Sequence, residues 1–291
     1  MLNHEQKQSV DGGSIAAQAG RDVVITSGVS AADVISLCEF LWKSNFPVLR
    51  EEARRVAEEN VQAFAVALDK KLKTRESDIE TSRFADPDIQ AAISDAVKAC
   101  ARRGEEANPD ILSSLITEKV SSETDGYMGI VFSEAVQVVP RLTSAQISLL
   151  SVVMLVTHMA FRTVRSLEEL EALSRLALRF SEPAFGLPPA QKRHIHYTGA
   201  AMVLGSTTVY TRHNLYESKA LQYGGLCAGE PFSIALHQRA PSYAKILDQY
   251  LADKLEMVTL NSVGQAIALA NISRYFGRLN FESWLNSEDM L

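Results

Sequence analysis

The sequence predicts a mainly α-helical protein, a multi-helix bundle preceded by a small N-terminal β-arch or hairpin. Hydrophobic residues form 46% of the 291 residues, which is ample for a folded core, while aromatic residues form only 7%. From Ser30 onward, apolar residues recur at helical spacing between capping and proline signals. Residues 9–29 instead alternate with a period of two, which is typical of strands.

Residues 9–28 hold the predicted β element. Apolar residues alternate on both sides of a turn at residues 20–22. Each strand is only about four residues long, which is too short to be stable alone, and its edges are open. We therefore expect the element to pair with copies in neighbouring subunits and to form a homo-oligomer; the alternative is a hairpin folded onto its own helical domain. The expected self-association residues are Ile15, Ala17, Val23 and Ile25.

Two long helices are expected between residues 31 and 73. Ser30 can cap the first helix, which runs to about Asn45 with one apolar face. Pro47 interrupts the chain before the second helix, which runs to about Lys73. Because charges of both signs recur at helical spacing on the second helix, we interpret its polar face as solvated. We expect the pair to project from the assembly of β elements.

Local start and stop signals define the next helices. Asp86-Pro87 and Asn108-Pro109 each combine an N-cap residue with a first-turn proline. Thr143-x-x-Gln146 and Ser166-x-x-Glu169 are capping boxes. The expected helices cover residues 86–103, 108–120, 122–139, 143–165 and 166–180.

Three prolines and a glycine within residues 182–190 mark the clearest internal boundary. The expected units are the β element at 1–29, a helical domain at 30–181 and a mostly helical domain at 182–291. In the last unit, residues 200–210 fit either a strand or a helix. Helices are expected over 241–257 and from about Leu260 to Gly277.

Charge and apolar patterning exclude several classes of protein. The net charge is −6, and no stripe of cations is present, so we expect no nucleic-acid partner. The longest apolar run, residues 147–161, is shorter than the roughly 20 residues of a membrane span, and we expect a buried helix there. Three scattered cysteines and a polar N-terminal stretch predict a reducing, cytoplasmic compartment without a secretory signal.

Several stretches resemble known families. Residues 13–25 resemble one coil of the haemagglutinin-type β-solenoid repeat, whose rungs stack through backbone hydrogen bonds. The whole chain resembles an uncharacterised bacterial family of soluble proteins. The last of the matching patterns is also similar to the ends of abortive-infection helical proteins, although Asn261 stands where Thr is expected, and this similarity implies a role in phage defence or stress. The matching patterns are Gln18–Ile25, Asn45-Phe46…Leu49…Ala53, Phe132-x-Glu134-Ala135 before Leu142-Thr143, and Leu260-x-x-x-Gly264-x-x-Ile267-Ala268.

Two short motifs are compatible with chemistry. Residues 225–229 have the G-x-nucleophile-x-G pattern around Cys227, but the motif requires a preceding strand, so a glycine-rich turn with a packed thiol is the favoured interpretation. His194 and His196 would share a face if the chain were extended there, and a metal would still need a third ligand such as His213 or His237. We predict that this pair binds no structural metal.

Two other residues lie on apolar helices. His158 is interpreted as a core histidine, and Glu134 as one partner of an ion pair with Arg141 or His158. Glycine-loop, H-E-x-x-H and C-x-x-C motifs are missing from the sequence, and we expect no cofactor. The first functional hypothesis is a cytoplasmic, self-assembling interaction protein, in phage defence or stress response. The alternative is a helical hydrolase that uses His194, His196 and Cys227 in residues 191–237.

Overall fold

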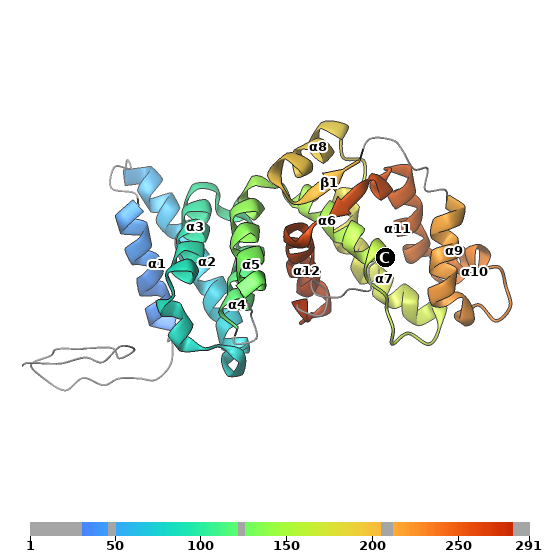
Figure 1. Ribbon diagram of the computed structural model, residues 1–291, viewed down its shortest axis with the longest axis horizontal. Helices are drawn as coiled ribbons and strands as arrows, with labels where there is room; N and C mark the ends of the chain where they lie inside the picture. The colour runs from blue at the N-terminus through green and yellow to red at the C-terminus, as the bar shows by residue number, and fades with distance from the viewer. Residues whose placement is uncertain (1–30, 46–50, 122–125, 205–211, 282–291) are drawn as a thin grey trace, which may run out of the picture.

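The computed structural model describes residues 31–45, 51–121, 126–204 and 212–281 (Figure 1). These residues form twelve α-helices, short 3₁₀ turns and one two-stranded sheet, which confirms the mainly α-helical fold. The expected β element at 1–29, with Ile15, Ala17, Val23 and Ile25, lies outside the described residues. None of the described helices has the length and apolarity needed to cross a bilayer.

The first five helices pack together at one end of the molecule (Figure 1). The two expected helices of the 31–73 region are present and pack into this group: α1 lies against α2 and α3, and α2 lies against α3 and α4. The reason is apolar burial, because α1 places Val34, Cys38 and Trp42 in the core. The projection of these two helices from an assembly of β elements stays a prediction. The five helices are α1 (Ala31–Asn45), α2 (Glu51–Thr74), α3 (Pro87–Arg103), α4 (Pro109–Val120) and α5 (Gly126–Val138).

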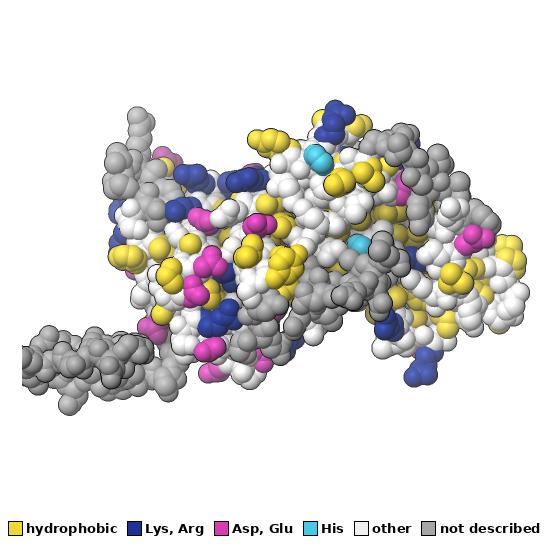
Figure 2. Space-filling model, in the orientation of Figure 1, with side chains coloured by type: hydrophobic (Ala, Val, Ile, Leu, Met, Phe, Trp, Pro, Cys, Tyr) yellow, Lys and Arg dark blue, Asp and Glu magenta, His cyan; other side chains and the backbone are white. Residues whose placement is uncertain are grey.

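The outer surface of this group carries charges of both signs (Figure 2). On α2, Arg54 pairs with Glu51 at 2.7 Å and Arg55 pairs with Glu59 at 2.6 Å, each one turn apart. All four side chains are about half exposed or more. This is the solvated helix face that the charge pattern predicts.

Capping side chains start three helices where the sequence indicates, whereas Asn108 precedes α4 in a left-handed conformation and its side chain forms no capping hydrogen bond. The Asp86 side chain accepts a hydrogen bond from the Asp88 N–H at the start of α3. Thr143 and Gln146 form a complete capping box at the start of α6 (Ser144–Thr157). Before α7 (Leu167–Ser181), Ser166 caps the Glu169 N–H, while the Glu169 carboxylate accepts from the N–H of Arg165 instead of Ser166. These starts depend on contacts within one turn, which a sequence pattern can identify.

Two helices end earlier than expected. Helix α6 ends at Thr157 instead of about Arg165, and the N–H of Phe161 donates to the Tyr223 hydroxyl at 2.8 Å. Helix α11 (Pro241–Ala252) ends before Met257, because Lys254 adopts a left-handed conformation with φ of 56°. The residues after Lys254 turn into a strand.

A small antiparallel sheet assigns a strand to the described part of residues 200–210, whose residues 205–210 lie outside the described ranges. Strand β1 (Ala201–Val203) pairs with β2 (Val258–Leu260), with Ala201 opposite Leu260 and Val203 opposite Val258. The N–H of Leu204 extends the pairing to the Met257 carbonyl at 2.9 Å. The remaining helices are α8 (Pro189–Thr198), α9 (Arg212–Tyr223), α10 (Phe232–Arg239) and α12 (Ser262–Phe276), of which α8 packs on β1 and α12 on β2.

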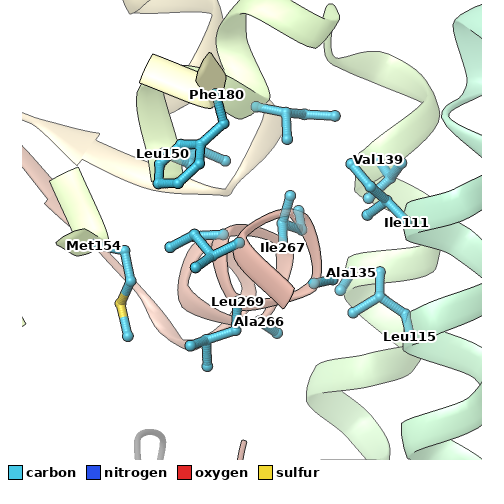
Figure 3. Close-up of a cluster of buried hydrophobic side chains, with 14 of the residues drawn as sticks. Ile111, Leu115, Ala135, Val139, Leu150, Met154, Phe180, Ala266, Ile267 and Leu269 are labelled. Carbon is cyan, nitrogen blue, oxygen red and sulfur yellow. The ribbon is translucent and has the colours of Figure 1, made fainter. Parts of the chain in front are cut away.

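Helix α12 lies between two halves of the molecule, the group α1–α5 and the group that contains α6, α7 and α11 (Figure 1). It packs against α6 and α7 on one side and against α4 and α5 on the other. Figure 3 shows Ile267 and its neighbours on α12 surrounded by apolar side chains of both halves. A helix enclosed in this way is apolar on nearly every face, and residues 266–270 of α12 are all buried. The predicted division into 30–181 and 182–291 stays a prediction.

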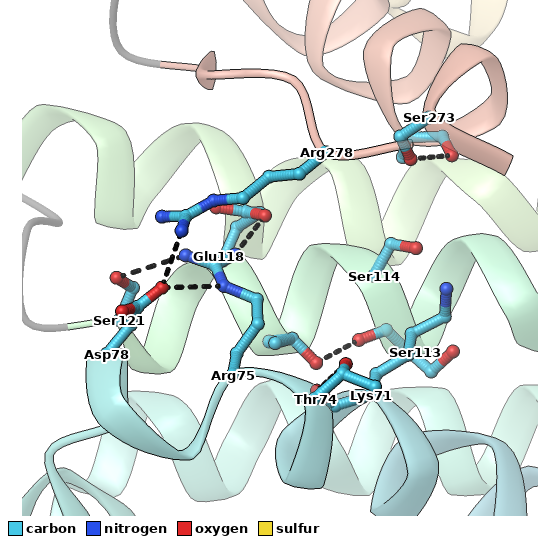
Figure 4. A network of polar contacts seen from close by, with 12 residues as sticks. Lys71, Thr74, Arg75, Asp78, Ser113, Ser114, Glu118, Ser121, Ser273 and Arg278 are labelled. Atoms are coloured by element: carbon cyan, nitrogen blue, oxygen red, sulfur yellow. Dashed lines mark hydrogen bonds and ion pairs between the residues drawn. The ribbon is translucent and has the colours of Figure 1, made fainter. Parts of the chain in front are cut away.

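A polar network holds the chain beyond α12 against the first group (Figure 4). Arg75, at the end of α2, pairs with Glu118 of α4 and with Asp78. Arg278, just after α12, pairs with the same Asp78 at 2.9 Å. Arg75 is largely buried, so the two carboxylates compensate the free-energy cost of removing its positive charge from water.

Candidate functional site

The two predicted histidines of the 191–237 region lie on helix α8. Because successive residues of a helix are about 100° apart, His194 and His196 point to different sides. His194 Nδ1 lies 3.1 Å from Gln146 Nε2, and His196 Nδ1 accepts a hydrogen bond from the Val203 N–H at 3.2 Å. The extended backbone that a shared metal would require is therefore not present at these histidines.

Of the two proposed third ligands, the structure describes the side chain of His237 alone. The side chain of His213 lies outside the described residues, and His237 pairs with Asp248 at 3.0 Å while stacking on Tyr216. Within the described ranges, no cluster of three or more histidine, cysteine or acidic side chains could hold a metal ion.

Cys227 occupies a turn after helix α9. The preceding element is a helix, whereas the G-x-nucleophile-x-G motif requires a strand. The thiol is buried, and its Sγ lies 3.9 Å from the Tyr223 carbonyl oxygen. Burial raises the pKa of the Cys227 thiol, which leaves less of the reactive thiolate. The geometry is that of a packed thiol in a glycine-rich turn.

The proposed hydrolase residues therefore have separate surroundings. His194 contacts α6, His196 contacts β1, and Cys227 contacts the end of α9. None of these hydrogen bonds joins one of the three to another. The sequence hypothesis of a shared cleft has no support from these contacts.

The two apolar-helix candidates differ from expectation. Glu134 is exposed on α5, and no ion pair joins it to Arg141 or His158 among the residues that the structure describes. His158 is half-buried just after α6. Its burial, together with the positive charge of nearby Lys219, lowers its pKa and favours the neutral imidazole.

A surface pocket lies beside α8 and β1. It has a volume of about 480 Å³ and combines cations with apolar side chains. Tyr197 is 83% exposed and Met202 is 54% exposed on the same two elements. In Figure 2, hydrophobic and basic side chains occur together over this region. The lining includes Lys192, Arg193, His196, Leu204, Lys254 and Met257.

This pocket has the chemistry of a protein-contact surface. Large apolar side chains that stay exposed next to cations are typical of interfaces. Asp253 is the acidic residue in the lining, and its Oδ2 already accepts the Gly186 N–H at 2.9 Å. The surface therefore suits an acidic partner that also offers apolar side chains.

Sequence reasoning missed two polar residues of a second pocket, Lys219 and Glu256. Lys219 is 2% exposed, although its place on a short polar helix indicates a solvated side chain. One Glu256 carboxylate oxygen is buried without a hydrogen-bond partner. No sequence signal marks either residue, because their burial depends on packing between distant segments.

Comparison with known proteins identifies a family whose description states no activity. A family model described only as "-like" matches residues 28–228 and, in a second segment, residues 211–285. The chain therefore belongs to this family, which confirms the expected membership of an uncharacterised family. No curated protein and no solved structure matched the chain.

Proposed function

We propose that the protein is a cytoplasmic, self-assembling helical interaction protein whose residues 9–28 join subunits into a homo-oligomer. The observation that carries the proposal is the strand-like alternation of these residues ahead of a helical body with its own core. Stacking the segment on copies of itself would pair its backbone groups and bury Ile15, Ala17, Val23 and Ile25.

The extent of the family match supports a separate role for this segment. The family model begins at residue 28, at the end of the alternating residues. The body that follows has its own core from α1 onward, with Phe64 and Leu68 of α2 fully buried. A segment with strand periodicity in front of such a body is suited to joining subunits.

The α8 surface supports a role in binding a protein partner. Tyr197 and Met202 are exposed on α8 and β1, and these two elements also line the pocket that holds the cations. In an oligomer, several such surfaces would be presented together, and repeated weak contacts would add to a stronger attachment. We propose that this activity serves bacterial phage defence or stress response, as the sequence resemblance to abortive-infection proteins implies.

Light scattering on the full chain tests self-association. The double variant Ile15→Asp with Ile25→Asp puts charges on the face that is proposed to stack, and we expect its mass to fall to that of the 31.9 kDa monomer. The matched control is Gln18→Asp with Thr26→Asp, which changes the opposite face and should keep the oligomer. Equal masses for both double variants and the unmodified chain would contradict the proposal.

A phage-challenge assay tests the biological role. Bacteria that express the unmodified chain should survive infection better than cells with an empty vector. The Ile15→Asp with Ile25→Asp variant should lose that protection, while the control pair should keep it. Protection by the monomeric variant would contradict the proposal that defence requires self-association.

A further inference from the structure

A small pocket lies between the end of α6, helix α9, helix α11 and strand β2. Its volume is about 210 Å³, which is below the 300–1,000 Å³ that is common for larger ligands. Apolar side chains form part of the wall, and polar groups form the rest. The apolar part is made by Val156, Leu215, Val258 and Leu260, and the polar part includes His158, Lys219, Tyr250 and Glu256.

Lys219 supplies a buried cation without a counter-ion. Its side chain is 2% exposed, and its Nζ donates to the Gln222 side-chain oxygen at 3.0 Å. No carboxylate of the described residues lies within ion-pair distance of this ammonium group. An amide oxygen satisfies one donor but leaves the charge uncompensated, and a buried charge of this kind favours an anion.

The neighbouring groups do not supply that anion. His158, from the end of α6, is neutral or positive, and burial followed by the Lys219 charge lowers its pKa. Tyr250, from α11, carries a hydroxyl group. Glu256 lines the same pocket, but it forms no ion pair with Lys219. The Lys219 end of the pocket is therefore electropositive.

Glu256 has a carboxylate oxygen that lacks a hydrogen-bond donor in the described part of the chain. Its Oε2 atom is buried and has no hydrogen-bond partner among the described residues. Buried carboxylate oxygens are nearly always paired with a donor, and an unpaired one carries a large desolvation cost. One pocket thus holds a cation that needs an anion and a carboxylate oxygen that needs a donor.

We propose that this pocket binds a small α-amino acid with an apolar side chain. The ligand carboxylate pairs with Lys219 Nζ, the ligand ammonium donates to Glu256 Oε2, and the side chain lies against Val156, Leu215 and Leu260. The pocket volume admits a molecule of this size. The proposal does not depend on self-association.

Calorimetry on the full-length protein tests this with three probes of matched shape. Leucine carries both charges, 4-methylpentanoate lacks the amine, and 3-methylbutylamine lacks the carboxylate. We expect leucine to bind and each truncated probe to bind at least about tenfold more weakly. Equal binding of leucine and 4-methylpentanoate would overturn the proposal, because the pocket would then recognise an anion alone.

Two substitutions test which pocket residue binds each charged group of the ligand. Lys219→Met should abolish leucine binding, while Lys70→Met, at an exposed lysine of α2, should leave it unchanged. Glu256→Gln should remove the preference for leucine over 4-methylpentanoate. The proposal is wrong if leucine, valine and methionine all fail to bind with a Kd below about 1 mM, or if folded Lys219→Met binds leucine normally. The comparison of probes on the unmodified chain decides the matter even if a variant fails to fold.

Discussion

Two buried lysines show how differently one side chain can be accommodated. Lys119 is 2% exposed, and its Nζ donates to the Asp88 carboxylate and, at 2.9 Å, to the Gly129 carbonyl. Lys219 is equally buried but has only the Gln222 amide oxygen as a partner in the described part of the chain. The Asp88 carboxylate compensates the buried charge of Lys119, whereas the buried charge of Lys219 has no such partner among the described residues and lowers the stability of the folded protein.

We expect Lys219→Met to stabilise the unliganded protein at pH 7. Burial lowers the pKa of Lys219 from 10.5 to about 8, so the unfolded chain binds more protons between these values. The stability of the unmodified chain should therefore rise as the pH increases from about 8 to 10.5. At pH 7 the buried charge costs about 3 kcal/mol, which Met would remove.

Urea unfolding at pH 7 and at pH 10.5 measures this effect. The stabilising difference between Lys219→Met and the unmodified chain should shrink at the higher pH, because folded Lys219 is then neutral while the unfolded lysine is already half deprotonated. Lys119→Met is the comparison, because it removes a compensated lysine and should lower stability at pH 7. A loss of stability in Lys219→Met would show that its charge has a partner.

We expect the three cysteine thiols to be inert in the folded protein. All three are free and buried. Burial is the main cause that raises the pKa of Cys38 and Cys100 to about 12 and also raises that of Cys227. Because the thiolate is the reactive form, a chromogenic disulfide reagent at pH 7 should label them only after unfolding. Rapid labelling of Cys227 in the native protein would revive the nucleophile hypothesis.

At the scale of elements, local signals were predictable and long-range ones were not. The Asp86 and Thr143 caps lie within one turn of the groups they bind, and both were identified from the sequence. The end of α6 depends on Tyr223, far along the chain, and β1 is a three-residue strand paired with β2. The Lys219 and Glu256 pocket was missed for the same reason, since tertiary packing alone buries these residues.

Asn261 shows a residue whose departure from the expected pattern has a structural use. Its Oδ1 accepts the Gly264 N–H at 2.9 Å and caps α12, as a threonine hydroxyl would. Its Nδ2 also donates to the Gly199 carbonyl at 2.6 Å, which ties the end of α8 to the start of α12. A threonine side chain has no amide NH₂ group with which to donate to Gly199 while its oxygen caps α12. The asparagine amide therefore links two elements that a threonine would leave unlinked.

We expect Gly264→Ala to destabilise the protein by about 1–3 kcal/mol, because overpacking forces the backbone to move. A methyl group at this position would overlap the carbonyl oxygen of Ala200, just before β1. The control is Gly129→Ala in helix α5, where the nearest atom to the new methyl would be Lys119 Nζ at 3.8 Å. That variant should gain roughly 0.5–1 kcal/mol from helix propensity. Thermal unfolding compares the two, and a neutral Gly264→Ala would disprove the close approach.

At the scale of the whole molecule, α12 joins segments that the sequence assigns to different domains. It follows the proline-rich boundary at 182–190, yet it packs against α4 and α5 as well as α6 and α7. Arg278, directly after α12, also pairs with Asp78 near the end of α2. These contacts connect the two halves through buried surface, so a loss of α12 packing should lower the local stability of the helices on both sides.

We therefore expect Ile267→Ala to weaken both halves together. Ile267 is fully buried on α12, and its truncation should cost about 2–5 kcal/mol. Hydrogen exchange should show a parallel loss of protection in α3 and in α11, which lie on opposite sides of α12. Ile130→Ala, at a residue that is 58% exposed on α5, is the control and should change neither helix. If protection falls in α11 while α3 keeps its full protection, the two sides of α12 unfold independently, which would contradict this prediction.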